Sequence, residues 1–594
     1  MQQTPDTAPV VSVIQRARTW FGLLVVIFAI FTIRAFYLQV IRYDYYKKAA
    51  LSDQLREYAI TAPRGTITAH EGSALVPLVL NQKLYTLYAD PTLVKNTSEA
   101  AYKVAGVIGG DAASLNKKIS ATHTRYVILA KRISAEQSQK ILSYKLPGIG
   151  TQEQDYRTYP QGSLASQLLG FVSDDGAGVY GLEQALNSRL KGKDGQLKAV
   201  TDVHGIPLAA STDNISTPPK PGDNLTLTID LGMQAQLENI LKTAQEKNKS
   251  KDVSAVIMDV HTGAVKAMAN YPTFDPASYQ KVEDPGLFQN DVVTQAIETG
   301  SIMKVLTTAT GLNTGAINAG SSFYDPGKWQ IDGATISDVA EDHSTGQQTV
   351  ESTLNLSLNT GATWILMQLG GGQINQKARE TLHDYFVNHF QLGQPTGIEQ
   401  GYESAGTIHG PKDTGSAINL TYANMSFGQA MTATALQMDA AFSSVLNGGT
   451  YYRPYLVESV TSADGKVTPT QPKVVKDNVV SGKVSSDIVA LLERVNQEHI
   501  AEGFSYLNFG SNYKVGGKTG SAQLALPGGG YSTTDFNATY IGFVGGDTPQ
   551  YAIAVYNMQP HISYGFAGAQ AAQPIFADLA HMLINDFGVT PKSH

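Results

Sequence analysis

The sequence has 594 residues, too many for one ordinary domain, so about two or three folded units are expected. Hydrophobic residues make up 42% and charged residues 16% of the chain, a composition typical of globular rather than disordered proteins. The net charge of −7 does not support a nucleic-acid-binding protein, and the lack of cysteine excludes disulfides, thiolate zinc sites and a cysteine nucleophile.

The first element in the chain is an apolar segment. Residues 20–33 are uninterrupted apolar sequence, and a second apolar run follows Arg34. A helix from Trp20 to Ile41 would be roughly 33 Å long, enough to cross a bilayer. The segment runs on through bulky residues without a small-residue cleavage site, which favours an uncleaved membrane anchor over a signal peptide. Basic residues flank it on both sides, so their count does not decide its orientation.

The region after the anchor is expected to be an extended α+β module. Residues 43–60 have the pattern of an amphipathic continuation of the anchor helix. Short alternating runs broken by glycine and proline follow from residue 62 to about residue 210, with helical stretches between them. A segment of turn-forming residues that begins at Ser211 predicts a linker.

The second half of the chain predicts a sheet assembled from distant segments. Residues 225–230 predict a strand that leads into a helix over 231–247, and residues 253–270 predict an antiparallel hairpin. A late strand over 551–558 and a final helix over 574–587 close the chain. Because strands lie at both ends of this segment with helices between them, we expect an α+β arrangement.

The first candidate catalytic element is Ser301 with Lys304. A serine hydroxyl needs an adjacent base, and a lysine can serve when burial or a second cation lowers its pKa. Residues at i and i+3 share a helix face, so Lys304 can reach the hydroxyl group of Ser301. The start of a helix also supplies N–H groups where an oxyanion would form. The pattern alone is weak, because other pairs have the same spacing: Ser114 with Lys117, Ser188 with Lys191 and Ser278 with Lys281.

Two further elements follow in the chain. Ser357 and Asn359 present a hydroxyl and an amide on alternate residues of a short turn, where they could relay a proton and hold a substrate amide. Lys518, Thr519, Gly520 and Ser521 come after two glycines and suit a strand that edges a cleft, with a cation and hydroxyls for a carboxylate. A phosphate loop is excluded for this last element, because the required upstream glycine is absent and no helix follows.

The three elements, in this order, resemble the Ser-x-x-Lys, Ser-x-Asn and Lys-Thr-Gly motifs of penicillin-binding proteins and serine β-lactamases. Over nearly its whole length the chain is similar to the class B penicillin-binding proteins, most of all to the septal, cell-division members. The matching segments include APRGTI from Ala62, YPQGSLASQLLGFV from Tyr159, GLEQALN from Gly181, MDVHTGAVKAMANYPTFDP from Met258 and DVAEDHSTGQQTVESTLNLSLNTG from Asp338. The sequence departs from the family at Thr299, where proline is usual, and at Ser521, where threonine is usual.

This resemblance implies a domain plan. The expected fold is α+β, with a transmembrane helix, an extended α+β pedestal module and a C-terminal penicillin-binding domain whose antiparallel sheet is flanked by helices, like a serine β-lactamase. The expected boundaries are a cytoplasmic tail over 1–18, an anchor over 19–41, a non-catalytic, dimerisation-like pedestal over 42–220 and a transpeptidase domain over 221–590.

The resemblance also implies roles for single residues in a D,D-transpeptidase. Ser301 would attack the penultimate D-Ala carbonyl of a peptidoglycan stem peptide and release D-Ala, with Lys304 as general base. Ser357 would relay protons, and Asn359 would hold the donor peptide and orient Lys304. Lys518, Thr519, Gly520 and Ser521 would bind the terminal carboxylate, with Lys518 also lowering the pKa of Lys304. The backbone N–H groups of Ser301 and Ser521 would form the oxyanion hole.

The same family likeness implies the surroundings of the enzyme. No metal and no organic cofactor are expected, and no role is given to any histidine, including His343. The expected partners are stem peptides, β-lactams as inhibitors, the cytoplasmic membrane, a polytopic glycosyltransferase and other division proteins. The catalytic domain would lie outside the cytoplasm on a single-pass anchor. A side-wall elongation enzyme, a penicillin-binding sensor or scaffold, and a β-lactamase stay open as alternatives.

Overall fold

The computed structural model describes residues 10–47, 55–122, 124–200, 215–338, 345–413, 415, 417–525, 530–562 and 567–593. His343 lies outside these residues. The chain divides into two compact units, one made of Met1–Pro63 with Gly192–Pro221 and one made of Arg64–Lys191 with Gly222–His594. Each unit is described by itself.

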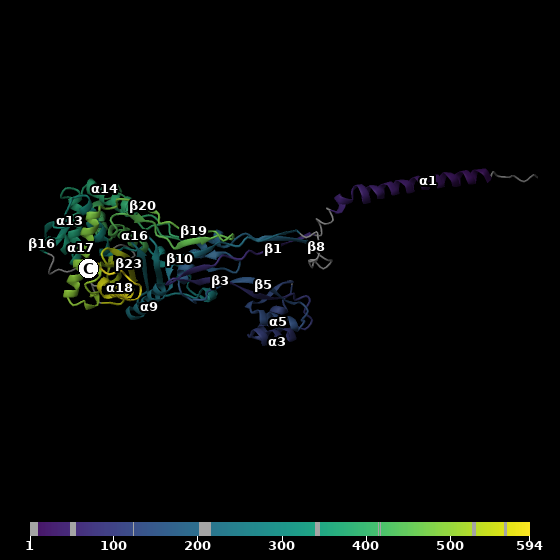
Figure 1. The fold of residues 1–594 in the computed structure, drawn as a ribbon, viewed down its shortest axis with the longest axis horizontal. Helices are drawn as coiled ribbons and strands as arrows, with labels where there is room; N and C mark the ends of the chain where they lie inside the picture. The colour runs from purple at the N-terminus through teal and green to yellow at the C-terminus, as the bar shows by residue number, and fades with distance from the viewer. Residues whose placement is uncertain are drawn as a thin grey trace, which may run out of the picture. The chain divides into compact units, whose positions relative to one another are not determined.

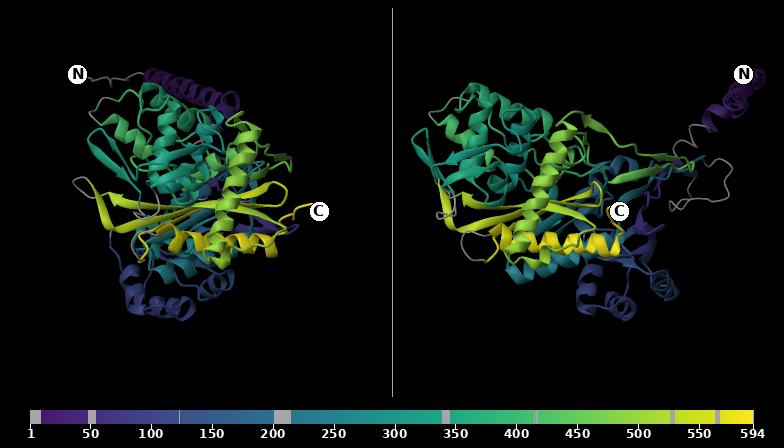
Figure 2. Two further views of the ribbon diagram at one scale, coloured as in Figure 1. Left: turned by 90° about the vertical axis from the view of Figure 1, so that its left-hand side faces the viewer. Right: turned by 60° about the vertical axis from the view of Figure 1, so that its left-hand side comes forward.

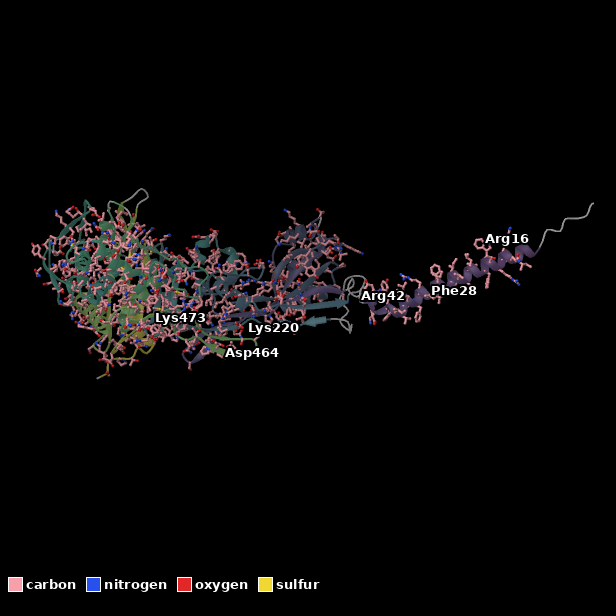
Figure 3. All side chains as sticks on the ribbon, turned by 90° about the horizontal axis from the view of Figure 1, so that it is seen from above. Arg16, Phe28, Arg42, Lys220, Asp464 and Lys473 are labelled. Carbon is pink, nitrogen blue, oxygen red and sulfur yellow. The ribbon has the colours of Figure 1, made fainter. Side chains whose placement is uncertain are left out.

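The first unit contains the apolar helix. α1 (Val10–Phe36) continues as one π-helical stretch, η1 (Tyr37–Ile41). The segment Ile14–Ile41 contains an 18-residue stretch with a mean hydropathy of 2.3 in which no residue is buried, and Figure 3 shows side chains projecting from this helix around Phe28. Among the described residues this is the one helix long and apolar enough to cross a membrane.

A small sheet in the first unit corrects two predictions. β1 (Leu55–Ile60), β8 (Gly195–Val200) and β9 (Ile215–Thr217) form an antiparallel sheet in the order β1-β8-β9. The prediction of helix up to residue 60 is therefore wrong over residues 55–60, because β1 pairs with a segment about 140 residues away, from residue 55 to residue 200. Of the predicted continuation, the structure describes residues 43–47, which are helical, and the strand residues 55–60. β9 likewise lies in the predicted linker. In both places, pairing with another strand overrides the local pattern.

The second unit begins with a sheet of seven strands in the order β19-β18-β10-β2-β3-β4, with β5 also paired to β3. β10 runs parallel to β2 and antiparallel to β18, so early and late parts of the chain share this sheet. The helices α3, α4 and α5 bury Ala100, Val104 and Ile141 with residues of β3 and β4. The bounds are β2 (Ile67–Glu71), β3 (Ala74–Ala89), β4 (Val127–Ile133), β5 (Ile149–Thr158), β10 (Asn224–Asp230), β18 (Val457–Thr461), β19 (Val467–Pro469), α3 (Thr97–Ile108), α4 (Ala112–Ile119) and α5 (Ala135–Ser143).

A buried ion cluster holds the short elements that follow. The Glu183 carboxylate, fully buried in α7 (Gly181–Ala185), accepts hydrogen bonds from Arg64 Nε at 2.7 Å and Arg157 Nε at 2.9 Å. Arg64 also donates to Asn187 Oδ1 at 2.8 Å. Burial lowers the pKa of Arg64, and the Glu183 carboxylate opposes that shift. The neighbouring elements are α6 (Ser166–Leu169), β6 (Phe171–Val172), β7 (Gly178–Val179) and α8 (Asn187–Leu190).

The second sheet of this unit has five antiparallel strands in the order β12-β11-β23-β22-β21. The strands are β11 (Asp252–Asp259), β12 (Val265–Tyr271), β21 (Lys514–Ala525), β22 (Tyr531–Gly545) and β23 (Pro549–Met558). Along β11 the side chains alternate between two apolar cores: Val253 and Ala255 pack with α9 (Leu231–Asn248) and α18 (Gln573–Asp586), whereas Val256 packs on the opposite face. Figures 1 and 2 show α18 in yellow on one face of these strands and green and teal helices on the other. The predicted hairpin, late strand and closing helix are confirmed.

The opposite face carries the helices that position the candidate site. α11 packs on α13, α16 and α17, and α17 runs along β21. The remaining elements of this unit are η2 (Pro276–Lys281), η3 (Pro285–Phe288), α10 (Asp291–Thr294), η4 (Gly300–Ile302), α11 (Met303–Asn313), β13 (Ser322–Asp325), β14 (Lys328–Ile331), β15 (Ala334–Ser337), β16 (Gly346–Thr349), α12 (Val350–Asn355), α13 (Asn359–Leu369), α14 (Gln376–Asp384), η5 (Tyr385–His389), α15 (Ile418–Ser426), α16 (Ala435–Leu446), β17 (Tyr451–Tyr452), β20 (Val474–Lys476), α17 (Gly482–Ala501), η6 (Ser505–Leu507) and η7 (Gly568–Ala572).

Candidate active site

Ser301 lies in a tight turn that is pressed against strand β21. It occupies η4, one turn before α11, and its hydroxyl makes no hydrogen bond within the described part of the chain. Gly300 has φ +62° and donates its N–H to Gly428 O at 3.0 Å. A Cβ on Gly300 would lie 2.9 Å from Ser521 O. Only glycine fits both that backbone angle and that space, and the turn thereby places Ser301 against the Lys-Thr-Gly strand.

Lys304 is fully buried directly behind this turn. Its Nζ donates to Ser357 O at 2.5 Å and Asn359 Oδ1 at 2.8 Å, and lies 3.2 Å from Ser357 Oγ. Burial, and next the charge of Lys518, hold the pKa of Lys304 well below its usual range. A neutral amine has two N–H donors, which the carbonyl and the amide oxygen accept. Its lone pair then remains to accept a proton from a hydroxyl group, as a general base must.

The second element is held in place by an unusual turn. Ser357 has φ +58°, in the left-handed region that a residue with a side chain rarely adopts. Asn359 begins α13, where its Nδ2 donates to Ser337 O at 3.0 Å. The backbone N–H groups of Asn359 and Thr360 both donate to Asp338 Oδ1. The hydrogen bonds of Asn359 and Thr360 thus stabilise the strained backbone conformation of Ser357. In this conformation both Ser357 and Asn359 contact the Lys304 amine.

Asp338 was not among the predicted site residues, although it begins one of the segments that resemble the family. The Thr360 hydroxyl contacts Asp338 Oδ2 at 2.6 Å and also Asp325 Oδ2. A hydroxyl has one proton and can donate to only one of the two carboxyl groups. Burial raises the pKa of Asp325. The charge of Asp338 raises the pKa of Lys304 against the two larger effects of burial and Lys518.

The third element lies on β21, at the edge of the five-stranded sheet. Lys518 is 1% exposed, and its Nζ donates to Thr519 O at 3.1 Å and Thr519 Oγ1 at 3.3 Å. Burial lowers the pKa of Lys518 to about 7. Ser521 Oγ accepts from Gly568 N–H at 2.9 Å. The hydroxyl oxygens of Thr519 and Ser521 therefore both accept a hydrogen bond, and their protons remain available to donate to a carboxylate.

Gly520 allows this strand to approach the nucleophile turn. A Cβ on Gly520 would lie 2.2 Å from Thr539 Oγ1 and 2.9 Å from Thr299 O. Thr539 Oγ1 itself donates to Thr299 O at 2.8 Å, which ties β22 to the residue before Gly300. The structure thus brings the three predicted elements together. β21 packs on η4, and Lys304 donates a hydrogen bond to Asn359 of the second element. The charge of Lys518 on β21 lowers the pKa of Lys304.

Burial separates this Ser-Lys pair from the others with the same spacing. Lys304 is fully buried, whereas Lys117, Lys191 and Lys281 are exposed. A solvated lysine keeps its proton at neutral pH and is not a base. The Ser-x-x-Lys spacing alone does not distinguish the four pairs; the order of the three elements and the burial of Lys304 do.

Comparisons with known proteins agree with these features. The family described as penicillin binding protein transpeptidase domain matches residues 253–581, and the penicillin-binding protein dimerisation domain matches residues 59–227. Stage V sporulation protein D of Bacillus subtilis is 31% identical over 98% of this chain and 87% of its own length. The peptidoglycan D,D-transpeptidase FtsI of Escherichia coli is 27% identical over 94% of this chain and 90% of its own length.

Solved structures show the same fold. The crystal structure of penicillin binding protein 3 from Mycobacterium tuberculosis, complexed with aztreonam, aligns with a TM-score of 0.67 at 24% identity, over 90% of this chain and 98% of that one. The predicted fold class is therefore confirmed. Together, the family matches and the near full-length relatives show that the chain belongs to the penicillin-binding protein transpeptidase family, as a class B member of the septal type.

Proposed function

We propose that the chain is a peptidoglycan D,D-transpeptidase that cross-links stem peptides through an acyl-enzyme on Ser301, in septal cell-wall synthesis. The observation that carries this proposal is the buried Lys304 amine, which lies against Ser357 and Asn359 beside the nucleophile turn and a second buried lysine. The names of the relatives, among them a D,D-transpeptidase FtsI, support the same activity.

In the first half-reaction Ser301 Oγ attacks the carbonyl carbon of the penultimate D-Ala. Its proton passes to neutral Lys304, and the tetrahedral oxyanion accepts hydrogen bonds from the backbone N–H groups of Ser301 and Ser521. The C–N bond then breaks as a proton moves through the Ser357 hydroxyl to the leaving amine of D-Ala. Removing one oxyanion donor of this kind typically costs about 10²–10³ in rate.

The Lys-Thr-Gly strand recognises the end of the donor peptide. The hydroxyl protons of Thr519 and Ser521 and the ammonium of Lys518 are the donors for the terminal carboxylate, with Gly520 permitting close approach of the peptide backbone. Asn359 holds the donor amide and orients Lys304. A β-lactam that presents a carboxylate beside a strained amide would occupy the same positions and acylate Ser301.

In the second half-reaction the amine of another stem peptide attacks the acyl-enzyme. It loses a proton to the Ser357–Lys304 pair, and Ser301 recovers its proton when its ester bond breaks. The product is a new amide cross-link, and no group is oxidised or reduced.

The anchor supports a location for this chemistry. Peptidoglycan lies outside the cytoplasm, so we infer that α1 crosses the cytoplasmic membrane once and that the catalytic unit is on the outer side. A polytopic glycosyltransferase that polymerises the glycan strand, together with other division proteins, is the partner class that this activity needs.

The test is covalent labelling with a fluorescent penicillin. The wild-type chain should be labelled stoichiometrically, and Ser301→Ala should abolish labelling without loss of folding. Lys304→Met should lower the acylation rate constant by at least about 10³-fold, because the hydroxyl then lacks its base. Ser114→Ala with Lys117→Met, an exposed pair with the same spacing, is the matched control and should leave labelling unchanged.

The same experiment separates the alternatives. Rapid release of the label would identify a β-lactamase, and labelling without cross-linking of stem peptides would identify a sensor or scaffold. A fluorescent fusion that localises to the side wall rather than to mid-cell would favour elongation over division.

A further inference from the structure

A second pocket lies in the same unit as the active site but contains none of its residues. It has a volume of about 370 Å³ and is lined by residues 179–181, 184, 288–290, 293–294 and 400–402. This volume is within the range of roughly 300–1,000 Å³ that small-molecule sites occupy in proteins. None of these lining residues takes part in the transpeptidase chemistry derived above.

The three walls of the pocket are bonded to one another. Asn290 Nδ2 donates to Gln400 Oε1 at 3.2 Å, and Gln400 Nε2 donates to Leu168 O at 3.1 Å. A Cβ on Gly401 would lie 2.1 Å from Gln184 Oε1, so the third wall rests directly on the first. These contacts join segments more than two hundred residues apart, from Leu168 to Gln400. The tertiary structure therefore fixes the position of the pocket walls.

The lining has a distinctive chemistry: aromatic rings and amides without charge. None of the described lining residues is Asp, Glu, Lys, Arg or His. Phe288 and Tyr180 hold each other with ring centroids 5.4 Å apart, and Tyr402 stands at the rim with 68% of its surface exposed. Within the described part of the chain, the phenol groups of Tyr180 and Tyr402 make no hydrogen bonds, so they are available to a ligand.

This chemistry selects an uncharged, polyhydroxylated ligand. Aromatic faces pack against the C–H faces of pyranose rings, and amides and phenols exchange hydrogen bonds with sugar hydroxyl and N-acetyl groups. A stem peptide carries carboxylates, and burying one here without a cation would be costly. The glycan backbone of an intact peptidoglycan strand is neutral, because its lactyl carboxyl groups are consumed in amide bonds to the peptides.

We propose that this pocket binds the glycan backbone of a peptidoglycan strand, at a site separate from the Ser301 cleft. The proposal rests on the proposed function, since that function makes peptidoglycan the substrate. The pocket wall leads directly to the nucleophile: Thr294 ends α10, and the chain reaches Ser301 seven residues later. A strand held here would stay on the enzyme while its stem peptides are exchanged at Ser301.

The test uses the full chain in detergent micelles after Ser301 has been acylated with penicillin, so that the active site is closed. The probe is tetra-N-acetylchitotetraose, a neutral oligosaccharide of the same N-acetyl pyranose type, and binding is measured by calorimetry and by saturation-transfer NMR. We expect the wild type to bind the probe and Tyr402→Ala to bind it about tenfold more weakly. Tyr402→Phe should keep most of the affinity, because it retains the ring.

The matched control is Tyr102→Ala, which removes a tyrosine that is 76% exposed on α3 and does not line the pocket. Its affinity for the oligosaccharide should equal that of the wild type. Absence of binding to the wild type, or equal binding by Tyr402→Ala, would overturn the proposal. Tyr402-dependent binding of a free stem pentapeptide, without binding of the oligosaccharide, would also overturn it in favour of a peptide site. The penicillin step reports on the transpeptidase independently, so failure of the proposed function is seen as absence of acylation.

Discussion

Lys304 and Lys518 are two buried amines to which the proposed mechanism gives different tasks. Both are almost completely buried, and burial is the first cause of the lowered pKa of each. Lys304 also experiences the charge of Lys518, which lowers its pKa further, whereas burial lowers the pKa of Lys518 to about 7. In the proposed mechanism Lys304 is the base and Lys518 is the carboxylate-binding cation.

This difference predicts a pH dependence. In the free enzyme the second-order rate constant of acylation by penicillin should fall as the pH rises through about 7, because Lys518 then loses the positive charge that binds the carboxylate. An arginine stays protonated at every accessible pH, so Lys518→Arg should move this alkaline limb upward by at least two pH units, at some cost in the maximal rate. The measurement is the rate constant from pH 5 to pH 10, and an unchanged alkaline limb would show that another group causes it.

Asp338 acts on the reaction through Lys304 and Asn359. Its charge raises the pKa of Lys304, so Asp338→Asn should lower that pKa and move the acid limb of the acylation profile to lower pH. The maximal rate should also fall about tenfold, because Asp338 orders the backbone of Asn359 and Thr360. A purely structural role would reduce the rate without moving the acid limb, which is the outcome against this assignment.

At the scale of elements, the site depends on how closely β21 approaches η4. Gly520→Ala would push its Cβ into Thr539 Oγ1 and Thr299 O and so separate the strand from the nucleophile turn. We expect penicillin labelling to fall by at least about 10²-fold, since small displacements of catalytic groups have effects of this size. Thermal unfolding should show that the chain is still folded.

Gly482→Ala is the matched control for this change, because a Cβ at the first residue of α17 would meet nothing within 4 Å. Its labelling should equal that of the wild type. Normal labelling of Gly520→Ala would show that the close approach is not required.

At the scale of the large unit, the buried ion cluster of Glu183, Arg64 and Arg157 connects three segments that are distant in the sequence. Glu183→Gln would leave the Arg64 and Arg157 guanidinium groups buried without a counter-charge. Breaking a buried ion pair in this way costs about 3–5 kcal/mol, so the midpoint of thermal unfolding should fall by several degrees. At temperatures well below that midpoint, the acylation rate of Glu183→Gln should equal that of the wild type. A lower rate at those temperatures would contradict a purely structural role for Glu183.

Local sequence patterns predicted some helices and strands of the molecule correctly and others wrongly. The hairpin of β11 and β12, the strand β23 and the helices α9 and α18 follow directly from their periodicity, because each buries an apolar face that the sequence makes visible. Residues 55–60 carry a helical pattern and still form β1, because their partner is β8. Periodicity contains no information about a partner so distant in the chain.

The residue types of the proposed site and their order are determined by the sequence itself, because serine, lysine, asparagine and the Lys-Thr-Gly run have few alternative uses in that combination. Only the tertiary structure decided which Ser-Lys pair is buried, that Asp338 supports the second element, and that uncharged residues from three segments line a pocket. The physical reason is the same in each case. Desolvation, charge and cavity shape arise from side chains brought together by the fold, and these neighbours are distant in the sequence.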